Sequence, residues 1–213
     1  MKNIAVFASG NGSNFQAIAE ASIKGMLKAK LKLLVCDSPR AFVLSRAKKF
    51  KVKTCLINPR DYLSKKDFEH EVINELKAER IDLIVLAGFM RILSPDFVKR
   101  YKNKIINIHP ALLPSFKGAH AIRDAFDYGV KLTGVTVHFV DEKMDHGPII
   151  LQEPLSVRDR ESLESLEEKI HQLEHQAYPR AINLFLSGKL KIIGRKVLIV
   201  SENKNRDSDH FLI

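Results

Sequence analysis

Short apolar segments alternate with amphipathic segments through the first half of the chain, and this alternation restricts the fold more than any other feature. Apolar, β-branched runs predict strands, and apolar residues at helical spacing predict helices between them. The predicted strands are residues 4–8, 31–35, 52–57, 81–87 and 104–108, and the predicted helices are residues 15–26, 40–50, 64–79 and 95–101. We therefore expect an α/β fold with a Rossmann-like, doubly wound, mostly parallel sheet and helices on both faces.

The second half of the chain departs from this alternation. Residues 119–128 predict a short helix, residues 132–140 alternate as a strand does, and residues 148–151 predict an apolar strand. A long helix begins at Ser162 and ends at Gly188, and Tyr178-Pro179 inside it predicts a kink or a break. Residues 190–193 and 196–200 predict a terminal hairpin. We expect one domain over residues 1–200, mixed in its C-terminal part, and a polar, frayed tail over residues 201–213.

Charge and apolar content narrow the class of protein. The chain of 213 residues has a formal net charge of +10, which suits nucleic acid or small anionic substrates. Its lysines are scattered and not interleaved with aromatic residues, which favours a solvated basic surface and no nucleic-acid partner. No apolar run could span a bilayer, and no signal peptide precedes the first strand, so we expect a cytoplasmic protein without a membrane partner. Cys36 and Cys55 are expected to be buried, reduced thiols.

A glycine-rich turn follows the first predicted strand. Residues 9–14 read Ser-Gly-Asn-Gly-Ser-Asn and lead directly into a helix. Backbone N–H groups at such a helix start bind anions. Phe15 replaces the third glycine of a dinucleotide-binding turn, so a single phosphate is the preferred ligand. The alternative is a tight turn without a ligand, in which Ser13 and Asn14 contribute side-chain donors or cap the helix.

Polar side chains stand where apolar ones are expected after the strand at 104–108. Asn107 and His109 have the spacing of two that places side chains on one face of a strand, at the carboxyl end where open α/β sheets bind ligands. Asp145 lies in a later turn between two apolar runs. An amide steadies an oxyanion, and an imidazole beside a carboxylate moves protons. We find no zinc spacing and no nucleophile elbow, so the chemistry is expected to be metal-free, direct transfer.

Each of these residues has a structural alternative. Asn107 could cap a turn, His109 could be a satisfied histidine beside a proline, and Asp145 could form a turn. His138 lies within a strand, where it orients Asp145 or packs in the core. The remaining histidines of interest, His120, His146 and His175, are expected on the surface.

The segment after the strand at 81–87 is unusually apolar for a connection. Phe89, Met90, Ile92 and Leu93 either pack inward or line a flat, hydrophobic ligand slot. On pattern alone, core packing is the preferred interpretation.

Taken together, the chain resembles the phosphoribosylglycinamide formyltransferases, folate-dependent enzymes of purine synthesis. The resemblance covers nearly the whole length and rests on SGNGSN (residues 9–14), AGFMRILS (87–94), NIHPALLP (107–114), GVTVHFV (134–140) and DHGPIILQ (145–152). It implies a single formyltransferase domain over residues 1–200, with a phosphate-binding half (1–100) and a catalytic, folate-binding half (101–200). His146 is a mild departure, because some members have glycine there.

The resemblance also implies roles for particular residues. The enzyme would pass a formyl group from 10-formyltetrahydrofolate to the amine of glycinamide ribonucleotide through Asn107, His109 and Asp145. The phosphate and ribose would be held by Asn11, Gly12, Ser13, Asn14 and Glu174. The pterin would be enclosed by Met90, Arg91, Ile92, Leu93, Val140 and Asp141. The supporting residues would be His138, Thr136, Gly118 and Pro114, with a cis bond at Leu113-Pro114.

Three alternatives remain for the function. Methionyl-tRNA formyltransferase carries an additional C-terminal domain, for which the chain is too short, and formyltetrahydrofolate hydrolase carries an additional N-terminal one. A non-catalytic nucleotide-binding or RNA-binding module would use the basic charge alone. We expect small-molecule partners only, and a monomer or a homodimer.

Overall fold

The computed structural model describes residues 1–200, and the expected tail over residues 201–213 lies outside the described residues. Within them the strands are β1 (Lys2–Ala8), β2 (Ala29–Cys36), β3 (Lys53–Leu56), β4 (Leu83–Leu86), β5 (Ile105–His109), β6 (Leu132–Phe139), β7 (Ile149–Ser156), β8 (Leu190–Ile193) and β9 (Lys196–Ile199). The helices are α1 (Ser13–Ile23), α2 (Val43–Lys49), η1 (Pro59–Asp61), α3 (Lys65–Ala78), α4 (Pro95–Arg100), α5 (Ala121–Tyr128) and α6 (Leu163–Leu186).

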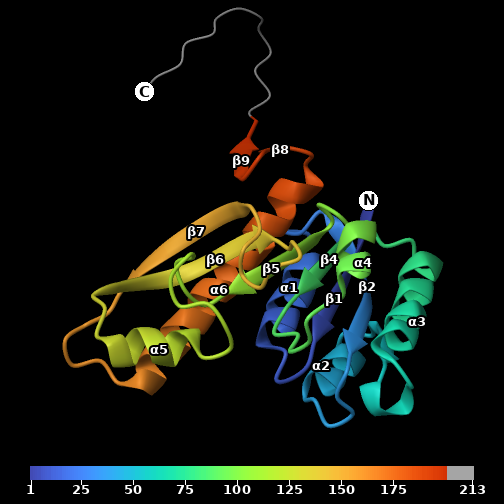
Figure 1. Cartoon of the computed structure of the whole chain (residues 1–213), viewed down its shortest axis with the longest axis horizontal. Coiled ribbons are helices and arrows are strands. Elements are labelled where there is room, and N and C mark those ends of the chain that lie inside the picture. Colours follow the sequence, from blue (N-terminus) through green and yellow to red (C-terminus); the bar gives the residue numbers. More distant parts are fainter. Residues whose placement is uncertain (201–213) are drawn as a thin grey trace, which may run out of the picture.

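The described strands form one mixed sheet in the order β3-β2-β1-β4-β5-β6-β7-β9-β8 (Figure 1). Strands β1 to β5 pair with one another in parallel, whereas β6 is antiparallel to both β5 and β7. The expected doubly wound, mostly parallel sheet with a mixed C-terminal part is confirmed. The chain winds outward in opposite directions from the β1–β4 pair, and the crevice at such a switch point is where open α/β sheets bind ligands.

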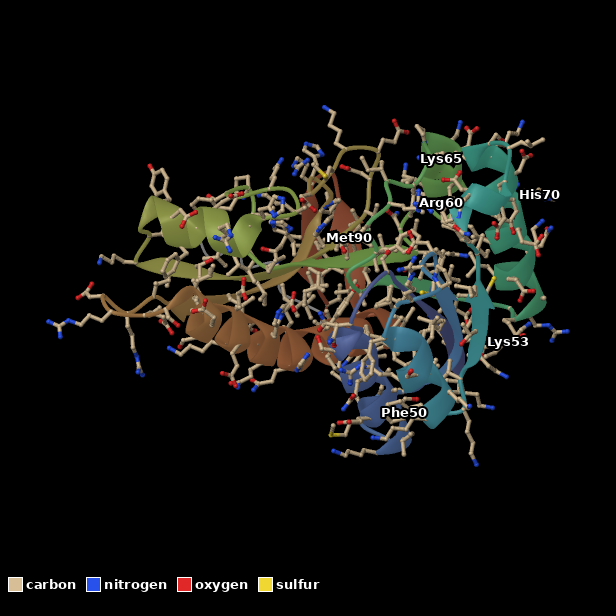
Figure 2. All side chains as sticks on the ribbon, turned by 90° about the horizontal axis from the view of Figure 1, so that it is seen from below. Phe50, Lys53, Arg60, Lys65, His70 and Met90 are labelled. Atoms are coloured by element: carbon tan, nitrogen blue, oxygen red, sulfur yellow. The ribbon has the colours of Figure 1, made fainter. Side chains whose placement is uncertain are left out.

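Side chains of the parallel strands are buried on both faces of the sheet. On β1, Ile4, Val6 and Ala8 belong to the core shared with α1, α2 and α6, whereas Ala5 and Phe7 belong to the core shared with α3 and α4. Figure 2 shows α1 and α6 on one side of the sheet and α3 on the other. This two-sided burial explains why these strands read as continuous apolar runs.

Helix α6 continues through Pro179, so the expected break is absent. Proline removes one helical hydrogen bond, but the helix is held against the sheet beside this position. Tyr178 is fully buried, and its hydroxyl lies 2.6 Å from the carbonyl oxygen of Leu86 on β4 and 3.1 Å from that of Ile106 on β5. Tertiary packing therefore overrides the local preference of proline.

Other expectations differ in detail. Strand β7 extends to Ser156, beyond the apolar run that predicted it, because its polar end still pairs with β6. Cys36 is buried as expected, but Cys55 is only half-buried on the outer strand β3. No helix within residues 1–200 has the length and apolar character needed to cross a membrane.

Candidate functional site

The adjacent parallel strands β1, β4 and β5 bring three loops to one edge of the sheet. Because all three strands run in the same direction, their carboxyl ends meet at this edge, which we call the rim. The rim receives the turn after β1, the connection after β4, and the end of β5 with Asn107 and His109. Antiparallel pairing with β6 places His138 opposite Asn107 and Thr136 opposite His109.

His109 is buried and held at both ring nitrogens. Its Nε2 lies 2.7 Å from the carbonyl oxygen of Phe116, which can only accept, so Nε2 carries a proton. Its Nδ1 faces Asp145 Oδ2 at 3.5 Å. The orientation of the ring is therefore set chiefly by a backbone carbonyl that no sequence pattern indicates, and this leaves Nδ1 facing the carboxylate.

Asp145 reaches this position through an uncommon backbone conformation. Its φ is 48°, in the left-handed region that few side chains adopt without support. The carboxylate is anchored by the Gly118 N–H, which donates to Oδ2 at 2.9 Å. Gly147, two residues later, packs so closely on the Phe139 carbonyl that a Cβ there would overlap it. The conformation of this turn therefore places the Asp145 carboxylate beside His109.

His138 orients Asn107 rather than Asp145. Its Nδ1 lies 2.8 Å from the Phe139 carbonyl oxygen and carries the proton, so its Nε2 accepts from Asn107 Nδ2 at 3.3 Å. The same Nε2 is 3.9 Å from Asp145 Oδ1. Burial lowers the pKa of His138, although the Phe139 carbonyl and Asp145 oppose this effect. A neutral His138 keeps the amide N–H₂ of Asn107 directed into the site.

Thr136 and Pro114 support the loop after β5. The Thr136 hydroxyl is fully buried, donates to the Ala111 carbonyl at 2.7 Å and accepts from Leu113 N–H at 3.0 Å. Gln152 on β7 adds a bond from Nε2 to the Leu113 carbonyl at 2.9 Å. The Leu113–Pro114 bond is cis, as expected. Side chains of two neighbouring strands thus fix the loop that continues to Phe116.

The turn after β1 owes its shape to Gly12. This residue has a φ of 77° and is the N-cap of α1 without a side-chain cap, so Ser13 and Asn14 lie inside the helix and do not cap it. A Cβ at Gly12 would overlap Val43. Arg46 secures the turn from α2, because its Nε donates to the Asn11 carbonyl and its Nη2 to Asn11 Oδ1, both at 2.9 Å.

Asn14 and Glu174 meet at the other end of the turn. Asn14 Nδ2 donates to Glu174 Oε2 at 3.0 Å, and His171 Nδ1 lies 3.0 Å from the same oxygen. The Glu174 contact raises the pKa of His171. Asn14 Oδ1 is buried and has no hydrogen-bond partner among residues 1–200, which is uncommon for a protein acceptor. His171 and Arg46 were missed in the sequence; only the spacing of three between His171 and Glu174 could have indicated the former.

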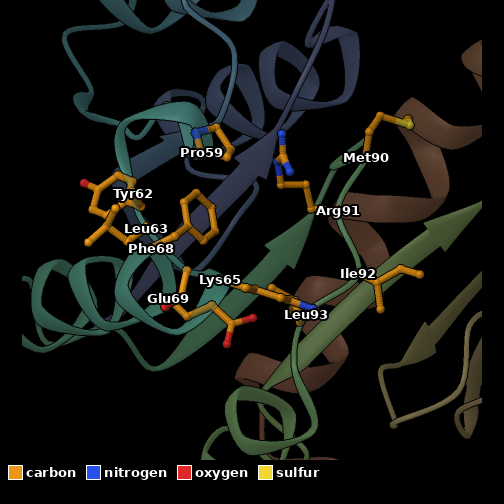
Figure 3. Close-up of a pocket in the computed structure, with 11 residues that line it drawn as sticks. Pro59, Tyr62, Leu63, Lys65, Phe68, Glu69, Met90, Arg91, Ile92 and Leu93 are labelled. Carbon is orange, nitrogen blue, oxygen red and sulfur yellow. The ribbon is translucent and has the colours of Figure 1, made fainter.

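The connection after β4 exposes apolar side chains. Met90 is 71% and Ile92 68% exposed, so core packing was the wrong interpretation for both, whereas Leu93 is buried. Arg91 Nε donates to the largely buried Asp37 at 2.7 Å. Figure 3 shows the cavity of about 540 Å³ between this connection and α3; it is lined by Met90, Arg91, Ile92, Leu93, Pro59, Tyr62, Leu63, Ser64, Lys65, Phe68 and Glu69.

Two residues predicted for the folate site do not line that cavity, and two histidines predicted on the surface are half-buried. Val140 and Asp141 do not line it. Asp141 instead accepts from the Lys143 N–H and contacts His146 Nδ1 at 2.7 Å. His120 is exposed as expected, but His146 and His175 are half-buried. Among residues 1–200, no group of three or more histidine, cysteine, aspartate or glutamate side chains is arranged to hold a metal ion.

Comparisons with known proteins agree with this geometry. Residues 2–182 match the family model described as formyl transferase. The chain is 46% identical over 186 residues to a phosphoribosylglycinamide formyltransferase of Bacillus subtilis, covering 87% of this chain and 95% of that protein. It is 41% identical over 189 residues to a trifunctional purine biosynthetic protein of Gallus gallus, covering 89% of this chain but only 19% of that longer protein.

Solved structures show the same similarity. A glycinamide ribonucleotide transformylase from Symbiobacterium toebii superposes with a TM-score of 0.91 at 39% identity, covering 94% of this chain and 95% of that one. One from Geobacillus kaustophilus gives 0.85 at 50% identity, covering 87% of this chain and 99% of that one. The resemblance inferred from the sequence motifs is confirmed: the chain belongs to the formyl transferase family.

Proposed function

We propose that this enzyme transfers the formyl group of 10-formyltetrahydrofolate to the amine of glycinamide ribonucleotide. The observation that carries the proposal is the cluster of buried His109 with half-buried Asn107 and Asp145 at the rim, in which Nδ1 of His109 lies beside a carboxylate. Amide, imidazole and carboxylate are the groups that an acyl transfer from a neutral donor to an amine requires. The names of the relatives at 46% and 50% identity support formyl transfer to this ribonucleotide.

Each member of the cluster has a distinct task in this proposal. Attack by the amine places negative charge on the formyl oxygen, and the second N–H of Asn107 Nδ2 donates to it while the first is held by His138. The imidazole of His109 donates through Nε2 to the Phe116 carbonyl, so Nδ1 is the nitrogen that takes up and releases the proton. Asp145 provides the negative charge that stabilises a protonated ring. The proton leaves the amine directly or through water and is returned to N10 of the folate, so that the bond from the formyl carbon to N10 breaks and tetrahydrofolate leaves as the formyl group stays on the amine.

The turn after β1 and helix α6 would hold the ribonucleotide. Backbone N–H groups of Gly12, Ser13 and Asn14 face a phosphate at the start of α1, and the Asn11 side chain is fixed beside them by Arg46. Glu174 uses Oε2 for its protein contacts, so we assign Oε1 to a ribose hydroxyl. A hydroxyl from the ligand would also satisfy Asn14 Oδ1.

The folate would lie against the exposed apolar residues after β4. Met90 and Ile92 offer an apolar surface at the rim, and the cavity of about 540 Å³ beside them has the size of a small-molecule site. The charged side chains that line the cavity are Arg91 and Lys65, which are positive, and Glu69, which is negative; the remaining single positive charge suits an anionic cosubstrate. We include Val140 and Asp141 in the folate site, on the resemblance alone.

The decisive experiment measures formyl transfer to glycinamide ribonucleotide, beside a reaction with water as the only acceptor. Product formation only with the ribonucleotide supports the proposal, whereas formate release in its absence indicates a hydrolase. Ser13→Ala and Asn14→Ala should raise KM for the ribonucleotide about tenfold, since each loses a hydrogen bond near a charged ligand, and change KM for the folate little. Asn74→Ala, an exposed asparagine of α3, is the matched control. Equal effects on both substrates would contradict the phosphate site.

A further inference from the structure

The loop over residues 141–147, which carries Asp145, is held from outside by the C-terminal hairpin. Arg195 stands in the turn between β8 and β9, and its Nη2 donates to the His146 carbonyl at 2.7 Å. Its Nη1 lies 3.0 Å from His146 Nε2. The hairpin lies beyond residue 182, where the family match ends, and β9 reaches the sheet through the pairing of Lys196 with Ile149 on β7 (Figure 1).

His146 is held from two sides. Its Nδ1 faces Asp141 Oδ2 at 2.7 Å, and a carboxylate only accepts, so this nitrogen carries a proton. Nη1 of Arg195 lies 3.0 Å from Nε2 and 3.3 Å from Nδ1, so the guanidinium lies over the ring face and not along the lone pair of one nitrogen. Arg195 on the hairpin and Asp141 at the beginning of the 141–147 loop thus both hold His146, and the bond from Nη2 to the His146 carbonyl fixes the backbone at the end of the loop. Glycine at position 146 would offer only its carbonyl.

The loop needs this support because of its backbone. A non-glycine residue at a φ of 48° is strained relative to ordinary conformations, so it persists where its surroundings hold it. Gly118 holds the side chain of Asp145, and Gly147 packs on the Phe139 carbonyl. Arg195 supplies the remaining restraint, on the residue directly after Asp145.

We propose that Arg195 is a positioning residue that keeps Asp145 beside His109 by holding His146. The inference rests on the proposed function for its effect on turnover, but not for its effect on the loop. Losing the guanidinium lets the 141–147 loop relax, and Asp145 spends less time at the distance of 3.5 Å from His109 Nδ1. Substrate binding at the turn after β1 is untouched.

The test compares Arg195→Met with Lys196→Met. Both remove one positive charge from adjacent exposed positions of the hairpin, but of these two side chains Arg195 is the one that hydrogen-bonds to the loop. Arg195→Met should lower kcat about tenfold, in line with the cost of a small displacement of a catalytic group, and leave both KM values within about twofold. Arg195→Lys retains the charge with a single donor group and should recover part of the loss. Lys196→Met should match the wild type.

Hydrogen exchange separates this inference from the proposed function. Amides of residues 141–147 should exchange faster in Arg195→Met than in Lys196→Met, without any substrate present. Faster exchange in a protein that transfers no formyl group would overturn the proposed function and leave the role of Arg195 in the loop standing. Unchanged exchange and unchanged kcat in a correctly folded Arg195→Met would overturn the inference.

Discussion

The turn over residues 9–14 and the cluster of Asn107, His109 and Asp145 occupy one rim but are built in different ways. The turn takes its shape from one glycine with a positive φ at the start of α1, and Arg46 and Val43 of α2 support it from one side. The cluster joins residues from β5, β6 and the 141–147 loop, and its orienting groups include two backbone groups, the Phe116 carbonyl and the Gly118 N–H. The proposed phosphate site thus occupies six consecutive residues with one supporting helix, whereas the proposed catalytic site depends on pairing between distant segments.

This difference predicts how each region fails. Damage to the cluster should reduce kcat and spare binding, because its side chains are oriented for the reaction. Damage to the turn should raise KM for the ribonucleotide and spare the reaction once the substrate is bound.

The largest effect is expected in the cluster. His109→Ala and Asp145→Ala should each lower kcat by about 10²–10⁴-fold, the usual contribution of a proton-transfer group. Steady-state kinetics measures this, with far-UV circular dichroism to verify folding. His120→Ala removes an exposed histidine and serves as the control. Near-normal turnover in either cluster variant would remove the distinction between the two regions.

A smaller effect on stability is expected in the turn. Gly12 and Gly25 both have a positive φ, but only at Gly12 would a Cβ overlap another side chain, that of Val43. Gly25→Ala should cost about 1 kcal/mol of unfolding free energy from backbone strain alone. Gly12→Ala should cost about 1–3 kcal/mol more, from overpacking, and should also raise KM for the ribonucleotide. Equal denaturation midpoints for the two variants would show that the contact with Val43 does not shape the turn.

The smallest effect, and the one that separates the regions most cleanly, is the dependence on pH. Burial lowers the pKa of His138, so a neutral ring accepts from Asn107 at pH 6.5 and above, until the pH falls to the lowered pKa. Its contribution to stability is complete above that value and is lost as the pH falls toward the lowered pKa. At this acid end, kcat should fall, because protonated Nε2 cannot accept from Asn107.

The ribonucleotide region should respond in the opposite direction. Glu174 raises the pKa of His171, so the positive charge near the phosphate turn persists above pH 6.5 and is lost only as the pH rises through the raised value. KM for the ribonucleotide should therefore increase at the alkaline end. In His138→Gln, kcat should no longer fall at acid pH. In His171→Gln, KM for the ribonucleotide should no longer rise at alkaline pH. A variant that keeps the pH dependence of the wild type would contradict the role assigned to that histidine.

Much of this architecture could be predicted from residues alone. Alternation identified the parallel strands, and a spacing of two identified Asn107 and His109. These features are local, and local patterns survive folding. The cluster also required His138, whose neighbour across the sheet is known only once β5 and β6 are paired in register.

The errors have physical causes. Met90 and Ile92 were interpreted as core because apolar residues are usually buried, but both are exposed at the rim. Pro179 was expected to kink or break the long helix, and the break is absent because Tyr178 holds the helix against the sheet. The carbonyl of Phe116 could not have been found, because every residue carries one and only the path of the loop selects it. Arg195 could not have been found either, because only the packing of the hairpin brings it to the 141–147 loop.

Tyr178 also has a consequence for which acceptors the enzyme uses. Its hydroxyl is shared between carbonyls of β4 and β5, and Glu174 lies one helical turn before it. The distance between the Glu174 carboxylate, which we propose binds the ribose, and the Asn107 amide is therefore set by a helix fixed to the sheet and not by a loop. If the ribonucleotide binds as proposed, the enzyme selects its acceptor by the distance between the sugar and the amine. An acceptor in which this distance is shorter or longer would still bind, but its amine could not reach the formyl carbon.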